Sequence, residues 1–159
     1  MHTDPIRVDG PRTATPPATH LLVGVDRHPA GQAALAYAID LGRRLDAHVH
    51  VVHAIDIDDL PIDPDGPDFE DRVQATVTAE RDRACARLAA LPGNWTFHSA
   101  PGDPTQLLLS IADTAEVEMI VLGAPRHGVM SLLERLMGES VAARVIHHAH
   151  RPVTLVPAP

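Results

Sequence analysis

Short apolar runs alternate along the chain with segments in which apolar residues recur every three or four positions. The runs, which are rich in Val, Ile and Leu, predict strands at 20–26, 47–54, 94–100, 118–123 and 152–156. The periodic segments predict helices at 30–45, 68–91, 104–115 and 140–149. Strands that alternate with helices pair in parallel through right-handed crossovers. The pattern therefore predicts one α/β domain, a Rossmann-like, doubly wound, five-stranded parallel sheet with helices on both faces.

Two stretches fall outside this alternation. Residues 1–19 contain four prolines and few apolar side chains, so we expect a flexible arm before a domain that spans 20–157. Residues 56–67 form an acidic, Pro-rich loop, and residues 56–71 hold eight acidic side chains and no Arg. We interpret this loop as a solvated connection, with screening of a site or recruitment of a basic partner as the alternatives.

Charge and composition exclude several classes of protein. The chain has 13 Arg, no Lys and 21 acidic residues, and its formal net charge of −8 argues against nucleic-acid binding through a basic face. No apolar run approaches the roughly 18 residues of a membrane-spanning helix, and residues 1–19 lack the apolar segment of a secretory signal. Cys85, the single cysteine, cannot form an internal disulfide. We therefore expect a cytoplasmic protein that binds neither nucleic acid nor a membrane.

Candidate chemistry lies in two predicted loops. In parallel sheets, ligands bind beyond the carboxyl ends of the strands, where the strand order reverses. Arg27 and His28 follow the first strand. Because Arg126 and His127 follow the fourth, neighbouring positions for these two strands would bring four cationic side chains to one mouth. Nearby glycines and the free amides of a helix that starts at Ser140 then favour a phosphate-bearing ligand.

The order of elements and several short motifs resemble the universal stress protein family over residues 20–156. The motifs are Val-Gly-Val-Asp at 23–26, His53 at the end of the second strand, Gly-Asp-Pro at 102–104, Met-Ile-Val-Leu-Gly at 119–123, Ser-Val at 140–141 and Arg-Pro-Val at 151–153. The resemblance implies the strand order 3-2-1-4-5 and a homodimer through the last strand, Val153 to Val156. It also implies a regulatory module of the stress response that binds an adenine nucleotide, ATP with Mg²⁺.

The ATP-binding branch of that family carries the spacing Gly, two residues, Gly, nine residues, Gly and then Ser or Thr, from which this chain departs. Counted from Gly123, the next two positions of the pattern are not glycine. Counted from Gly128, nine residues lead to Gly138, but Glu139 then precedes Ser140. A carboxylate there would compete with phosphate for the helix amides, or would help to hold a divalent cation that bridges the phosphates.

Carried over by position, the resemblance assigns binding roles to residues in four segments. These are Val25 and Asp26 beside the nucleoside, Val52 and His53 beside adenine, Leu122 and Gly123 beside ribose, and Gly128, Gly138, Ser140 and Val141 beside the phosphates. Charge adds Arg27, His28, Arg126 and His127 at the mouth and Glu139 at the helix start.

The sequence leaves one alternative function open and argues against catalysis and against a metal site. A nucleotide-independent interaction module with the same fold is the alternative, favoured by Glu139 and the altered glycine spacing. The chain lacks a Walker lysine, a Gly-x-Ser-x-Gly elbow and a recognisable nucleophile–base pair, so we do not expect an enzyme. Histidines at 48 and 50 and at 147, 148 and 150 lack a completing cysteine or carboxylate cluster, so we assign no metal site.

Overall fold

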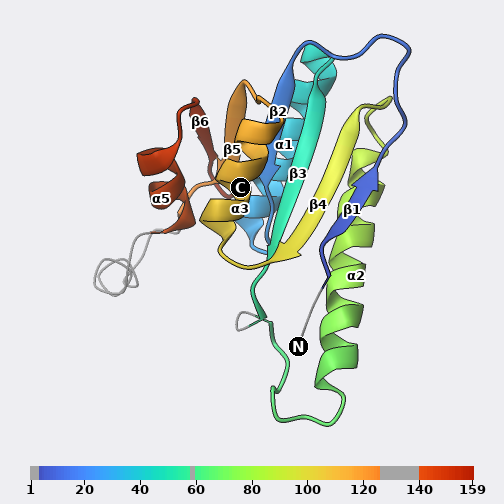
Figure 1. The fold of residues 1–159 in the computed structure, drawn as a ribbon, viewed down its shortest axis with the longest axis vertical. Helices are drawn as coiled ribbons and strands as arrows, with labels where there is room; N and C mark the ends of the chain where they lie inside the picture. Colours follow the sequence, from blue (N-terminus) through green and yellow to red (C-terminus); the bar gives the residue numbers. More distant parts are fainter. Residues whose placement is uncertain (1–3, 58–59, 126–139) are drawn as a thin grey trace.

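The computed structural model describes residues 4–57, 60–125 and 140–159, in which helices cover both faces of a twisted sheet (Figure 1). The elements are β1 (Ile6–Asp9), β2 (His20–Gly24), α1 (Pro29–Leu45), β3 (His48–Ile55), α2 (Phe69–Leu88), β4 (Trp95–Pro101), α3 (Pro104–Thr114), β5 (Met119–Gly123), α5 (Val141–His148) and β6 (Val153–Val156). The strands lie in the order β1-β4-β3-β2-β5-β6. All neighbouring pairs are parallel except β1 with β4.

The five predicted strands are β2 to β6, and their expected order, 3-2-1-4-5, is confirmed. Leu22 of β2 pairs with His50 of β3 on one side and with Ile120 of β5 on the other. Because β2 and β5 are parallel neighbours, their carboxyl ends meet at one edge of the sheet. The sequence argument that the loops after these two strands border one site required this arrangement.

The expectation of a flexible arm is wrong for residues 6–9, which form a sixth strand. β1 pairs antiparallel with β4, with Val8 opposite Phe97, and Gly10 N then donates to Trp95 O at 2.9 Å. The alternation of Ile6 and Val8 with charged residues suits an edge strand, because the apolar side chains pack on the core while the charged ones face outward. The unpaired edge of β4 supplies the hydrogen bonds that this short segment lacks by itself.

Two apolar layers hold the helices against the sheet. On one face, α1 and α2 bury Leu35 and Leu88 in a core that includes Phe97. On the other face, α3 and α5 bury Leu108 and Val145 against β2 and β5. Apart from Phe97 and Trp95 these cores are aliphatic, which is how a sequence with 3% aromatic residues fills its interior.

The acidic loop between β3 and α2 is anchored to the domain. Its apolar residues Ile57, Leu60 and Ile62 are partly buried against a small core that contains Ile55 and Val77. The interpretation as a solvated connection is therefore wrong for these three residues, which fix the path of the chain beside the carboxyl end of β3.

Two further features bear on function, namely the hydropathy of the described helices and the surroundings of the cysteine. Among the helices that the structure describes, none has the length and hydropathy to cross a membrane. Cys85 of α2 packs against an apolar core, and burial raises the pKa of its thiol above the ordinary value. A thiol of raised pKa is a poor nucleophile.

Candidate functional site

The turn after β2 is organised by Asp26. Its Oδ1 accepts the backbone N–H of His28 at 2.9 Å, and its carbonyl oxygen accepts from Nε2 of Gln32 at 2.6 Å. Val25 N donates to Val52 O at 2.9 Å, which continues the β2–β3 pairing just beyond the end of β2. These bonds hold the turn in place where it leads from the sheet into α1.

Two glycines bring the end of β5 against the start of α1. A Cβ at Gly123 would lie 2.6 Å from the carbonyl carbon of Ala30 and 2.7 Å from the nitrogen of Gly31. A Cβ at Gly31 would collide with the carboxylate of Asp26. Larger residues would push these segments apart, so the glycines set the distance between the two loops that flank the mouth.

A cleft of about 260 Å³ opens at this edge of the sheet. Nine of the residues assigned from the sequence line it: Val25, Asp26, Arg27, His28, Val52, His53, Leu122, Gly123 and Val141. A second cavity, of about 710 Å³, shares Gly123 and Val141 with the cleft and continues to Pro125 and Ser140. Apolar side chains line much of the cleft and polar groups stand at its rim, a combination typical of small-molecule sites.

The start of α5 faces both cavities. Ser140 caps the helix through its Oγ, which accepts from Ala143 N at 3.2 Å, and Val141 and Ala142 of the first turn line the cleft. Arg144 donates from Nη2 to Oδ2 of Asp103 at 2.8 Å. Since Asp103 caps α3, this bond ties the starts of two helices together. Free amides and the positive end of the helix dipole favour an anionic group here.

The charges around the cleft are mixed. Arg27 and His28 line the cleft as expected from the sequence, but Asp26, Asp56 and Glu80 line it as well. The cationic mouth is therefore only partly present among the described residues. An anionic ligand in such a site requires a cation to offset the carboxylates.

His53 and Glu80 form a buried pair in the wall of the cleft. Nε2 of His53 lies 2.9 Å from Oε2 of Glu80, and Nδ1 lies 3.1 Å from Oγ of Ser99. The hydrogen bond from His53 is the largest cause of a pKa of Glu80 below its ordinary value. Ser99 is 1% exposed, so its hydroxyl is closed to a substrate even though it contacts an imidazole.

Comparison with known proteins identifies the family. Residues 17–157 match the model of the universal stress protein family. The chain belongs to that family. This universal stress protein is 24% identical over 143 residues to universal stress protein MJ0531 of Methanocaldococcus jannaschii, and the alignment covers 87% of this chain and 82% of the relative.

Solved structures of universal stress proteins have a similar fold. One in complex with cAMP has a TM-score of 0.66 at 21% identity, over 89% of this chain and 98% of the other. The universal stress protein from Archaeoglobus fulgidus in complex with dAMP has a TM-score of 0.57 at 25% identity, over 87% of this chain and 97% of the other. The predicted family and fold class are thereby confirmed.

The structure gathers the sequence-assigned residues that it describes at one edge of this universal stress protein. Ser140 lies in the second cavity and the other nine line the cleft. The remaining assigned positions lie outside the described residues: Arg126, His127, Gly128, Gly138 and Glu139.

Two acidic residues of the cleft were missed by sequence reasoning. Asp56 directly follows β3, so the rule that selected the turn after β2 could have selected it as well. Glu80 lies within α2, and nothing in its sequence context separates it from the other acidic residues of that helix. Only the packing of α2 brings its carboxylate to His53.

Proposed function

We propose that this universal stress protein binds an adenine nucleotide in the cleft at the carboxyl ends of β2 and β5. The observation that carries the proposal is the continuity of a cleft lined by Val52 and Leu122 with the open first turn of α5. The apolar walls suit a nucleoside, and the amides at the start of the helix suit its phosphates. A relative of 25% identity in complex with dAMP supports the same ligand class.

ATP with Mg²⁺ is the form of nucleotide that we propose. The carboxylates of Asp26 and Asp56 border the cleft, where they would repel a bare triphosphate. A Mg²⁺ ion held by a carboxylate and phosphate oxygens removes this repulsion, since hard cations prefer oxygen ligands. Asp26 is the residue that we assign to the cation.

The bound nucleotide acts as a regulatory signal rather than as a substrate in this proposal. Ser99, whose hydroxyl contacts His53, is buried, so this pair offers no nucleophile to a bound nucleotide. We propose further that the protein acts as a homodimer through β6, an edge strand of the sheet with Leu155 38% exposed. Occupancy of the cleft would then alter contacts of the dimer with other proteins.

Thermal unfolding with and without ligand tests the proposal. Warming the protein with ATP, AMP, cAMP or dAMP, each with and without Mg²⁺, should raise the Tm for the nucleotides that bind. A ligand at 100 times its Kd adds about 2.7 kcal/mol of stability. No rise at millimolar nucleotide would refute nucleotide binding and favour the alternative of an interaction module.

Val141 allows a matched pair of variants. Val141→Glu places a carboxylate in the first turn of α5, where it stabilises the helix but repels phosphate. Val141→Gln has nearly the same size without the charge. We expect the Glu variant to bind ATP at least about tenfold more weakly than the Gln variant, because one charge contact of this kind is worth more than about 1.4 kcal/mol in a partly buried site. Equal affinities would place the phosphates elsewhere.

A further inference from the structure

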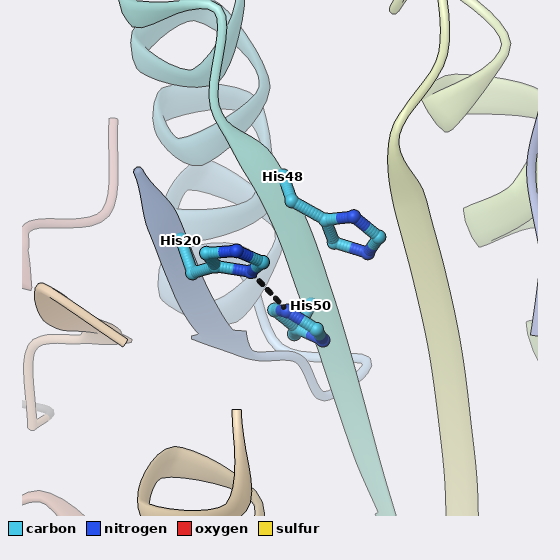
Figure 2. A group of neighbouring side chains, drawn as sticks. All are labelled: His20, His48 and His50. Carbon is cyan, nitrogen blue, oxygen red and sulfur yellow. Dashed lines mark hydrogen bonds between the residues drawn. The ribbon is translucent and has the colours of Figure 1, made fainter. Parts of the chain in front are cut away.

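Three histidines gather at the amino end of β2 and β3, opposite to the cleft. His48 and His50 point to the same face of β3, because side chains alternate along a strand. His20 begins β2 and pairs in register with His48. Figure 2 shows the three imidazoles side by side across the two strands. We call His20, His48 and His50 the histidine cluster.

The ring nitrogens of the histidine cluster are close enough to share an ion. One ring nitrogen of each residue lies within 4.8 Å of the other two. Nδ1 of His20 and Nε2 of His50 are 3.1 Å apart (Figure 2). In a tetrahedral site with bonds of about 2.1 Å, two ligand nitrogens are roughly 3.4 Å apart. The first pair is already close to this spacing, and a rotation of the His48 ring about its side-chain bonds would bring the third nitrogen nearer.

The cluster is partly exposed at the amino end of the sheet. On this face α3 packs against β2 and β3, where it covers Val52 near the carboxyl end of β3, and α5 packs against β6 (Figure 1). His20 and His48 are intermediate between buried and exposed, and the side chain of His50 is the most buried of the three. An ion can reach them from solvent, and a water molecule can take a fourth ligand position.

A second set of residues orients the imidazole of His48. Nε2 of His48 lies 2.9 Å from Oγ1 of Thr96, and that hydroxyl donates to Oδ1 of Asp9 at 3.1 Å. Since the hydroxyl has one proton and gives it to Asp9, it accepts from Nε2–H of His48 and leaves the ring lone pair on Nδ1. Metal-bound histidines are oriented in this way by carboxylates and hydroxyls beyond them.

Burial lowers the pKa of two of the three imidazoles. Burial is the largest cause of a pKa of His48 near 4 and of His50 near 3. In addition, the buried Nδ1 of His50 has no hydrogen-bond partner among the described residues.

We infer that His20, His48 and His50 form a site for one late first-row divalent metal ion of the Zn²⁺ type. Three imidazoles without thiolate suit Zn²⁺, Cu²⁺, Ni²⁺ and Co²⁺ better than Mg²⁺ or Ca²⁺, which prefer oxygen ligands. The ion would take the place of the hydrogen bond between His20 and His50, and the proton of that bond would move to the other nitrogen of its own ring, so both imidazoles stay neutral. It would also join β2 to β3 at the end of the sheet remote from the nucleotide cleft, so the two sites are separate.

Metal titration of the full chain tests this inference. After treatment with a chelator, calorimetric titration with Zn²⁺ should show one tight equivalent. His20→Gln and His50→Gln should each lower the Zn²⁺ affinity by more than about 100-fold, because loss of a ligand costs more than loss of an orienting residue. Thr96→Val should lower it by roughly tenfold. His147→Gln and His148→Gln, on the remote helix α5, are the matched controls and should change nothing.

A second measurement does not depend on variants that fold. Co²⁺ bound to the wild-type chain should give the visible spectrum of a four-coordinate nitrogen site without a thiolate charge-transfer band. Circular dichroism and nucleotide binding at the other end of the sheet report whether each variant is folded. Absence of a tight equivalent in the wild type would overturn the inference, as would loss of binding in the α5 variants with retention in the cluster variants.

Discussion

Nε2 of His53, on the central part of the sheet, lies 2.9 Å from Oε2 of Glu80 on α2. Both side chains are more than four-fifths buried, at 11% and 14% exposure. The pair therefore connects a strand to the helix layer through a charge-assisted contact in the wall of the cleft. In a partly buried position such a contact is stronger than an ion pair on the surface.

This pair makes stability depend on pH in a definite direction. The folded protein holds the pKa of Glu80 below its ordinary value of 4.5, so the unfolded chain binds the proton more readily. The contribution of Glu80 is complete above about pH 4.5 and is lost as the pH falls through the lowered pKa. We expect Glu80→Gln to cost about 1–2 kcal/mol at pH 7 and progressively less below pH 4.5, measured by urea unfolding.

Glu118, which is exposed, provides the control for that experiment. Glu118→Gln should leave the free energy of unfolding within about 0.5 kcal/mol of the wild type at every pH. A constant difference between Glu80→Gln and the wild type from pH 7 to pH 3 would mean that folding does not lower the pKa of Glu80.

Asp103 has two roles that substitutions can separate. Its Oδ1 accepts from Thr105 N at 3.0 Å as the cap of α3, and its Oδ2 accepts from Arg144. Asp103→Ala should destabilise the protein by about 1–2 kcal/mol, whereas Asp103→Asn keeps the cap and should cost less than half as much. Thermal unfolding compares the two. If Asp103→Ala and Asp103→Asn destabilise the protein equally, the ion pair with Arg144 accounts for the effect. Arg144→Gln should then lower the free energy of unfolding by the same amount.

β1 should stabilise the sheet even though it lies at an edge. Val8→Asp places a charge where an apolar side chain packs against the core, and we expect a loss of roughly 1–3 kcal/mol. The same variant should aggregate more readily, because it frees the edge of β4. Arg7→Ala is the control on the outer face, since its ion pair with Asp9 is exposed and worth little. Equal stabilities of the two variants would show that β1 contributes nothing.

The proposed dimer depends on the outer edge of β6. Val156 O accepts from Ala124 N and Pro152 O from Ile120 N, so alternate residues of β6 face β5 and Leu155 directs its amide to the open edge. Leu155→Pro should reduce the dimer to monomer in sedimentation experiments, because it removes that donor without breaking the pairing with β5. Leu155→Ala controls for the lost side chain. A dimer that persists in the Pro variant would place the interface elsewhere.

Local sequence patterns predicted most of the fold. The five parallel strands and four helices follow from apolar periodicity, and their ends fall within a few residues of the structure. The second helix, for example, ends at Leu88 rather than at 91, because Leu91 N bonds to Leu88 O in a tighter turn. β1 was missed because four alternating residues between prolines bury too little apolar surface to form a strand without the edge of β4.

The sequence predicted some residues of the candidate cleft and missed others. Asp26 and Gly123 were assigned by position from the resemblance, and the neighbouring positions of β2 and β5 confirm that their loops share one edge. Glu80 could not be assigned, since it is an ordinary helical acid until α2 packs over His53.

The sequence by itself determined the class of fold, the aliphatic core and the edge of the sheet at which a ligand would bind, because these depend on periodicity and on residues that directly follow strands. Only the tertiary structure decided which distant side chains meet. His20 lies opposite His48 because β2 and β3 pair in one register. The hydrophobic pattern of a strand fixes which side chains face the core, but the partner residue across the sheet is fixed only when the two strands pack together.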